Sequence, residues 1–166
     1  MDRKRDDLWV WGVGNILLGD DAVGCRVVEL LSVNGAQKVV DCGTTPENYV
    51  AKLSTNPPKT LLIVDAADME LLPGECRRLS LRDLEAVAET SHGIPHALLF
   101  APFEGAIEIA AIGIQPETLQ LGAPLSAAVE KAAREVAERI SKQEWRGFKP
   151  LTQNLREEPS DQNRSN

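Results

Sequence analysis

Residues 10–24 read Val-Trp-Gly-Val-Gly-Asn-Ile-Leu-Leu-Gly-Asp-Asp-Ala-Val-Gly, and the rest of the chain can be interpreted around them. They complete an apolar run, Leu8–Val13, which has the length of a strand buried on both faces. After the glycine-rich turn, apolar residues recur with helical spacing over residues 23–31. We therefore predict a buried strand, a tight turn and a helix, with Asp20 and Asp21 at the mouth of that helix.

The same succession of strand and helix continues downstream. Lys38–Cys42 and Leu61–Val64 are short apolar runs, and Thr45-Pro46 opens a short helix predicted at residues 46–54. Strands and helices that alternate at this spacing indicate an α/β fold with right-handed crossovers and helices on both faces of a parallel sheet. The later elements should be an edge strand at Cys76–Leu79, helices at residues 81–89 and 95–99, a strand at Ile107–Ile114 and a long helix after Pro124.

The composition fits one globular domain. A chain of 166 residues that is 43% hydrophobic can bury a core, and we assign residues 1–144 to a single α/β domain. Residues 145–166 are polar, and we expect this tail to be disordered. The net charge of −7 disfavours a nucleic-acid partner.

Cysteine usage and hydropathy indicate a cytoplasmic protein. The three cysteines lack CxxC spacing, which argues against a disulfide framework and for a reducing compartment. They lie on or near apolar segments, which favours buried thiols over ligands or nucleophiles. No apolar run approaches the roughly 18 residues of a membrane span, and we see no signal peptide. We therefore expect no membrane insertion.

A strand, a glycine-rich turn and a helix could also cradle a nucleotide phosphate. The glycines here are Gly12, Gly14 and Gly19, which do not follow the G-x-G-x-x-G pattern. Two carboxylates at the helix mouth would also repel a phosphate. The turn therefore disfavours nucleotide binding.

The paired aspartates have two interpretations. An aspartate at a helix N-terminus accepts backbone N–H groups, and one of the pair is expected to do so. One aspartate is enough to cap the helix, so the second is a candidate for a functional role. Asp65 is the next candidate because it follows a buried strand, and ligands of parallel sheets collect outside the carboxyl ends of strands. Two alternatives stay open: Asp65 caps the turn that follows, or Asp68 is the functional carboxylate in its place.

The histidines of the chain are His92 and His96. Two histidines four residues apart on a helix can share one metal, but Gly93 and Pro95 argue against a continuous helix between them. A single histidine in a loop is often an ordinary surface residue. Joined to two aspartates, however, His92 would complete a mixed oxygen and nitrogen set suited to a divalent metal.

Taken together, several motifs resemble those of the nickel–iron hydrogenase maturation endopeptidases, most of all the type that serves hydrogenase 3, the formate hydrogenlyase enzyme. The first motif is Gly-Val-Gly-Asn-Ile-Leu-Leu-Gly-Asp-Asp-Ala-Val-Gly at residues 12–24. The resemblance covers roughly residues 8–142, and its specificity comes from the ordered set. The other motifs follow in the family's order and spacing: Thr45–Asn48, Leu62–Met69, Pro73–Glu75, Ser91-His92 and Gly113–Glu117.

The resemblance implies a fold and an activity. The family's fold is a three-layer, twisted and mostly parallel sheet of about five strands with helices on both faces. Its members cut a C-terminal extension from the hydrogenase large-subunit precursor after nickel insertion. The family's metal-binding positions match Asp21, Asp65 and His92, whereas Asp20 matches an aspartate that we do not make a ligand.

Asp21, Asp65 and His92 are therefore our candidates for both metal binding and catalysis. The implied metal is nickel carried by the precursor, and zinc or cadmium can occupy such a site in vitro. An alternative is a nickel-sensing or nickel-delivery module without peptidase activity, which would bind free nickel tightly. Gly93 and the segment Phe100–Phe103 depart from the family's pattern. These departures affect the shape of the substrate groove more than the metal ligands.

Overall fold

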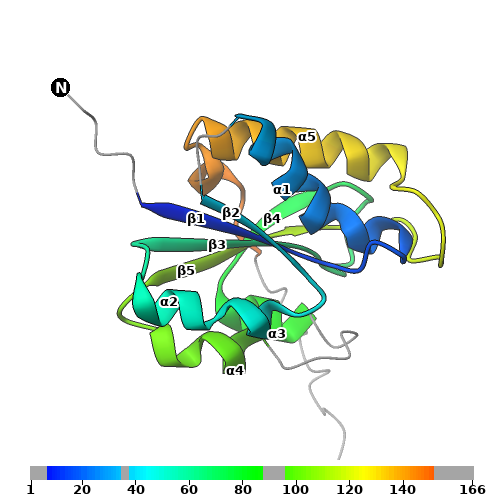
Figure 1. The fold of residues 1–166 in the computed structure, drawn as a ribbon. Helices are drawn as coiled ribbons and strands as arrows, with labels where there is room; N and C mark the ends of the chain where they lie inside the picture. The colour runs from blue at the N-terminus through cyan, green and yellow to red at the C-terminus, as the bar shows by residue number, and fades with distance from the viewer. Residues whose placement is uncertain (1–6, 35–37, 88–95, 152–166) are drawn as a thin grey trace, which may run out of the picture.

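The computed structural model describes residues 7–34, 38–87 and 96–151 of the chain. Within these ranges the chain forms a five-stranded sheet in the order β2-β1-β3-β5-β4 (Figure 1). Neighbouring strands run parallel except at one edge, where β4 pairs antiparallel with β5. The predicted α/β class with a mostly parallel sheet of about five strands is confirmed. The strands are β1 (Leu8–Val13), β2 (Lys38–Gly43), β3 (Thr60–Ala66), β4 (Cys76–Leu79) and β5 (Glu108–Ile114).

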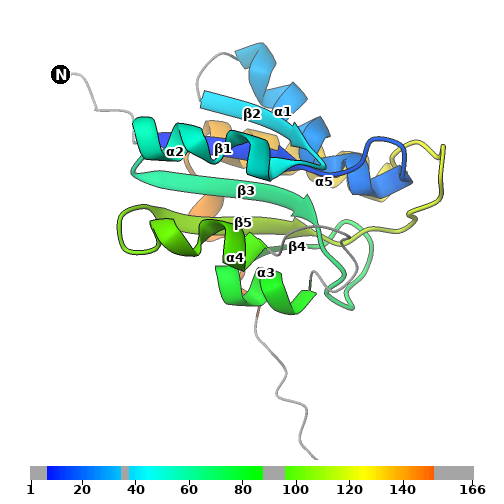
Figure 2. The same ribbon diagram turned by 60° about the horizontal axis from the view of Figure 1, so that its bottom comes forward.

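Helices cover both faces of the sheet (Figures 1 and 2). Helices α1 and α5 lie on one face, and α2, α3 and α4 lie on the other. None of the helices in the described ranges has the length and apolar character needed to cross a membrane. The helices are α1 (Val23–Asn34), α2 (Ala51–Thr55), α3 (Leu81–Val87), α4 (His96–Phe100) and α5 (Ala127–Ser141), and the 3-10 turns are η1 (Gly19–Ala22), η2 (Pro46–Tyr49), η3 (Ala101–Phe103) and η4 (Trp145–Gly147).

Strand β1, which lies between β2 and β3, is buried along its whole length and contributes side chains to both apolar layers of the core. Its side chains alternate between the layers because successive residues of a strand point to opposite faces. Leu8 and Val10 pack in the layer that contains the apolar face of α5, whereas Trp9 and Trp11 pack in the layer that contains Phe100 of α4. The apolar run at the start of the chain therefore supports both faces of the sheet.

Helix α1 crosses the sheet so closely that its first turn touches the ends of two strands. A Cβ added at Gly24 would lie 2.3 Å from the carbonyl oxygens of both Val13 and Val64. A Cβ added at Gly12 would lie 2.2 Å from the carbonyl oxygen of Gly24. Only glycine allows this approach. It brings η1, with its two aspartates, to the carboxyl end of β3, where Asp65 follows Val64.

The predicted helices differ from the structure mainly at their ends. The helix predicted at residues 46–54 is η2 followed by α2, and the short helix starts at His96 and passes into a 3-10 turn that contains Pro102. The end predicted for α3, residues 88–89, lies outside the described residues. A capping box opens α3, because Ser80 N–H donates to Asp83 at 2.9 Å and Asp83 N–H donates to Ser80 Oγ at 3.1 Å. Ion pairs between residues four apart lie along α5: Glu130–Arg134, Glu135–Arg139 and Glu138–Lys142.

The packed part of the chain extends beyond residue 144, where we had placed the start of the tail. Trp145 and Phe148 are buried in the same apolar layer as α5, because the chain after the helix folds back onto the sheet. Residues 149–151 then run beside the edge strand β4. Arg78 of β4 donates its N–H to the Lys149 carbonyl at 2.8 Å, and Leu151 N–H donates to the Arg78 carbonyl at 3.0 Å. The remaining tail lies outside the described residues.

Candidate functional site

The candidate site lies at the carboxyl edge of the sheet, on the right in Figure 1. Asp65 is the sixth residue of β3 and pairs in register with Gly113 of β5. Its side chain is 15% exposed, so the carboxylate is held mostly inside the protein at the rim of the sheet. In open parallel sheets this edge is where ligands bind.

Burial raises the pKa of Asp65 to about 6, because a carboxylate shielded from water is harder to ionise. Contact with His96 acts in the opposite direction, and the negative charge of Asp21 adds to the increase. The structure therefore brings Asp21 and Asp65 close enough for their charges to repel each other. Such a perturbed carboxylate in a rim position is typical of functional sites.

Asp21 lies in η1, and its position depends on the glycine-rich turn before it. Its Oδ2 atom accepts the backbone N–H of Asn15 at 2.8 Å, which closes the turn around the carboxylate. Asn15 in turn accepts the N–H of Leu17 on its side-chain oxygen at 2.9 Å. The Asp21 side chain is only partly buried. It therefore faces Asp65 from a loop whose backbone is held by hydrogen bonds.

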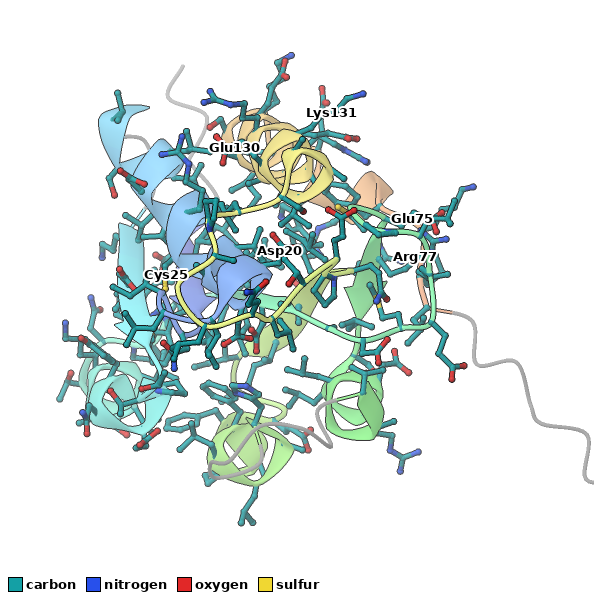
Figure 3. The ribbon with its side chains drawn as sticks, turned by 90° about the vertical axis from the view of Figure 1, so that its right-hand side faces the viewer. Asp20, Cys25, Glu75, Arg77, Glu130 and Lys131 are labelled. Atoms are coloured by element: carbon teal, nitrogen blue, oxygen red, sulfur yellow. The ribbon has the colours of Figure 1, made fainter. Side chains whose placement is uncertain are left out.

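Asp20 has a different environment from its neighbour. Figure 3 shows it between the start of α1 and the segment that leads into α5. Its Oδ2 atom accepts the N–H groups of Glu117 and Thr118 and the hydroxyl of Ser126, at 2.8, 3.1 and 2.9 Å. Its Oδ1 atom accepts the N–H of Ser126 at 2.7 Å.

These four hydrogen bonds use up the acceptor capacity of Asp20. Burial by itself would raise the pKa of Asp20, but the hydrogen bonds from Ser126, Glu117 and Thr118 outweigh it and hold that pKa below its usual range. The expectation that one aspartate accepts backbone N–H groups is met, although the donors belong to a distant loop and to the start of α5 rather than to α1. Asp20 is structural.

The third candidate, His92, lies outside the described residues. The histidine that the structure places beside Asp65 is His96, whose Nε2 atom lies 3.5 Å from Asp65 Oδ2. Within the described ranges, no group of three or more histidine, cysteine, aspartate or glutamate side chains is arranged to hold a metal ion. The described part of the site is thus two carboxylates and a buried imidazole. Gly93 and Pro95 had disfavoured a shared site for the two histidines, and no local signal marked His96 as a neighbour of Asp65.

Asp68, the competitor of Asp65, is used by the loop after β3. Its Oδ1 atom accepts the Glu70 N–H and the Gln115 amide, both at 3.2 Å. Gln115 is buried and its Oε1 atom accepts the N–H groups of Met69 and Leu71 at 2.7 and 3.2 Å. Asp68 and Gln115 therefore hold the loop beside the site in place. Asp65 takes no part in these loop contacts, so it is the functional candidate of the two aspartates.

The three cysteines do not join the site. Cys25 and Cys42 are buried, Cys76 is half-buried, and all three are free thiols. Burial raises the pKa of each to about 12, so the reactive thiolate is disfavoured. The prediction that they act as small apolar residues is confirmed by the burial of Cys25 and Cys42.

An apolar lip borders the site. It consists of Ile16, Leu17, Leu119 and Leu121, whose side chains are 48–72% exposed. The two loops that carry them lie side by side at the right of Figure 1 and are joined at Leu18 and Leu121, with the Gly122 N–H donating to the Leu17 carbonyl at 2.8 Å. Exposed apolar groups held on ordered backbone are typical of surfaces that contact another protein.

A perturbed carboxylate paired with a second one, at the carboxyl edge of a parallel sheet, defines an α/β enzyme with an acid–base or metal-binding site. Comparison with known proteins gives its family. The family model HycI, hydrogenase maturation protease, matches residues 25–143. Hydrogenase 3 maturation protease of Escherichia coli strain K12 is 34% identical over 139 residues, which cover 81% of this chain and 88% of that protein.

Solved structures agree with this match. The solution structure of the endopeptidase HycI from Escherichia coli superposes with a TM-score of 0.79 at 32% identity, covering 87% of this chain and 96% of that one. The [NiFe] hydrogenase maturation protease HycI from Thermococcus kodakarensis KOD1 gives 0.73 at 28% identity, covering 86% and 94%. The chain belongs to the hydrogenase maturation protease family, as its motifs predicted, and it is an endopeptidase.

Proposed function

We propose that this endopeptidase removes the C-terminal extension of a nickel–iron hydrogenase large-subunit precursor after nickel has been inserted. The observation that carries the proposal is the Asp21–Asp65 pair, in which a carboxylate with a pKa of about 6 faces a second carboxylate at the sheet rim. Family membership supports the substrate class. The free thiols are in keeping with a reducing cytoplasm.

We assign the metal-binding role to Asp21, Asp65 and His92. The chemistry of the described part fits a divalent cation, because a cation between the two carboxylates relieves their mutual repulsion, which adds to the larger effect of burial in raising the pKa of Asp65. In this proposal the nickel is part of the substrate, held by the precursor, and the three residues detect whether it is present. A metal bound there would polarise the scissile carbonyl.

The residues of the chain contribute the proton chemistry. In the metal-free protein a carboxylate with a pKa of about 6 is largely ionised at neutral pH, so it is ready to bind the nickel or, where the nickel is held by the other residues, to accept a proton from an attacking water molecule. Asp65 is suited to that role because it is shielded from bulk water. Asp21, which is more exposed and anchored through Asn15, is suited to positioning the precursor.

The apolar lip supports a protein substrate over a small molecule. Ile16 and Leu17 follow Asn15 directly, so the lip begins at the loop that anchors Asp21. A precursor whose tail reaches Asp65 would pass over these side chains. Burying them on contact would contribute to affinity, since each large aliphatic side chain taken from water is worth about 1.5–3 kcal/mol.

Processing of a purified precursor tests the proposal. The nickel-loaded precursor should lose mass at its C-terminus when the wild-type protein is added, and the nickel-free precursor should not. Asp21→Asn and His92→Ala should abolish the loss without unfolding the protein. Asp68→Asn is the matched control, because Asp68 lies in the loop after the same strand and its hydrogen bonds are to Glu70 and Gln115 rather than to Asp21 or Asp65. A His92→Ala variant that trims the precursor at the normal rate would overturn the assignment.

A nickel-delivery module without peptidase activity predicts a different result. Such a protein would bind free nickel tightly and leave the mass of the precursor unchanged. The endopeptidase proposed here should bind free nickel weakly, because its metal arrives with the substrate. Calorimetry with free nickel, run beside the processing assay, separates the two.

A further inference from the structure

His96 is the first residue of α4 and is held inside the protein. His96 is 6% exposed. Its ring is nearly parallel to that of Phe100, with an interplanar angle of 6° and ring centroids 6.3 Å apart. Phe100 in turn packs against Trp11 of β1, with centroids 5.9 Å apart. The imidazole is therefore clamped by packing in one orientation beside the end of the sheet.

The two nitrogens of this ring have unequal surroundings. Nε2 lies 3.5 Å from Asp65 Oδ2. Nδ1 is buried and has no hydrogen-bond partner among the described residues. A neutral imidazole carries one proton, and beside a carboxylate acceptor that proton belongs on Nε2. The described surroundings therefore favour the Nε2–H tautomer.

Packing by itself does not account for an imidazole at this position. With no partner among the described residues, the buried Nδ1 atom costs about 1–3 kcal/mol, and an aliphatic side chain could pack on Phe100 without that cost. The polar contribution of His96 is therefore made on its other side, at Asp65. There the ring nitrogen lies 3.5 Å from Oδ2, where an N–H donor can orient the carboxylate.

The geometry points to His96 as a positioning residue for Asp65. Its Nε2–H donates to Oδ2 and sets the plane of the carboxylate, so that Oδ1 is the oxygen left for the metal or the attacking water. The contact is long in the free protein, as such contacts often are before substrate binds. This role rests on the proposed function of Asp65, and it assigns His96 no contact with substrate or metal.

Two substitutions separate positioning from packing. His96→Leu keeps an apolar group on Phe100 but removes the donor, whereas His96→Gln keeps an amide N–H that can reach Asp65. Leu84→Val is the matched control, because Leu84 is buried in the same apolar layer and lies on α3. Each variant is measured for thermal unfolding, for kcat and KM on the nickel-loaded precursor, and for Cd²⁺ affinity by calorimetry.

We expect His96→Leu to lower kcat and Cd²⁺ affinity by about 10–100-fold, the usual effect of removing a group that orients a ligand, with little change in KM. His96→Gln should restore most of both, and Leu84→Val should lower the unfolding temperature with kcat kept. A His96→Leu variant with wild-type kcat and Cd²⁺ affinity would overturn the positioning role. So would a glutamine variant no better than leucine.

Nitrogen NMR of the histidine rings tests the same role without an activity assay. The Nε2–H tautomer is expected for His96 in the metal-free protein. The Nδ1–H tautomer, or a scalar coupling between bound cadmium and a His96 nitrogen, would overturn the positioning role, the second result by making His96 a ligand. If the wild-type protein cuts no precursor, the proposed function fails, and the tautomer and the Cd²⁺ titrations still decide the role of His96.

Discussion

Asp20 and Asp65 are two carboxylates withdrawn from water at the same edge of the sheet, and the protein treats them in opposite ways. Asp20 accepts four hydrogen bonds from Glu117, Thr118 and Ser126. Among the described residues, Asp65 has one long side-chain contact, with His96, and a backbone hydrogen bond at Ala66. The pKa of Asp20 is held below its usual range, and that of Asp65 is raised to about 6.

The difference teaches that burial alone does not identify a functional carboxylate. Asp20 is the less solvent-exposed of the two, yet its lone pairs are occupied by the chain itself, so it joins the first loop to the start of α5. Asp65 is left with acceptor capacity that the described residues do not fill. Unsatisfied capacity, more than depth, indicates which carboxylate can bind a cation or take a proton.

The largest expected effect is on activity at Asp65. Asp65→Asn keeps the size of the side chain but removes its charge and basicity, and the rate of precursor processing should fall by about 10²–10⁴-fold. Mass spectrometry of the precursor after timed incubation measures this. The folded structure should persist, as judged by circular dichroism. Full activity in Asp65→Asn would make Asp65 no more functional than Asp20.

The next effect is on stability at Asp20. Asp20→Asn places an amide NH₂ group against donors that now face Oδ1 or Oδ2, so at least one buried N–H or hydroxyl loses its acceptor. We expect the free energy of unfolding to fall by about 3 kcal/mol. Urea unfolding followed by circular dichroism measures the loss. Molecules that remain folded should still process the precursor, and a folded but inactive variant would move Asp20 into the site.

A smaller effect is expected in the pH dependence of stability. The pKa of Asp65 is about 6 in the folded protein and about 3.9 when unfolded, so between these values the folded state binds more protons. Stability should therefore fall as pH rises from 4 to 6, and the wild type should lose about 2–3 kcal/mol relative to Asp65→Asn across this window. Urea unfolding of both metal-free proteins over this range measures it. Parallel curves would contradict the raised pKa.

The smallest effect concerns an ion pair near the surface that joins α1 to α5, whereas Asp20 joins η1 to the residue that precedes α5. Arg26 of α1 contacts Glu130 of α5 at 2.9 Å, with side chains 26% and 30% exposed. Because such pairs are well solvated, Glu130→Gln should cost about 1 kcal/mol or less, and less still in high salt. Thermal unfolding at two salt concentrations measures it. A loss as large as that of Asp20→Asn would mean that burial of the acceptor matters little here.

The fold could be predicted from the sequence because its signals are local. The apolar run of β1, the helical spacing in α1 and the capping box at Ser80 each depend on neighbouring residues. Element ends were less predictable. Trp145 and Phe148 lie in a polar stretch, and their burial depends on a surface that α5 and the sheet form together.

The site was predictable only in part, because its contacts join distant segments. Asp65 was marked by its place after a buried strand. The hydrogen-bond partners of Asp20 lie about a hundred positions further along the chain, and no sequence pattern near Asp20 or Ser126 predicts these contacts. His96 was disfavoured because it follows a proline in a loop-like stretch. Its position beside Asp65 arises from packing on Phe100, which is a tertiary effect.

The backbone that runs beside β4 after Phe148 has a further consequence. An outer strand with free N–H and C=O groups is a template on which a second chain can add, and native proteins cover such strands. Here Lys149 and Leu151 occupy the hydrogen-bonding groups of Arg78. A chain that ends before residue 149 would leave β4 uncovered and would tend to self-associate, whereas a chain that ends after residue 151 would keep β4 covered.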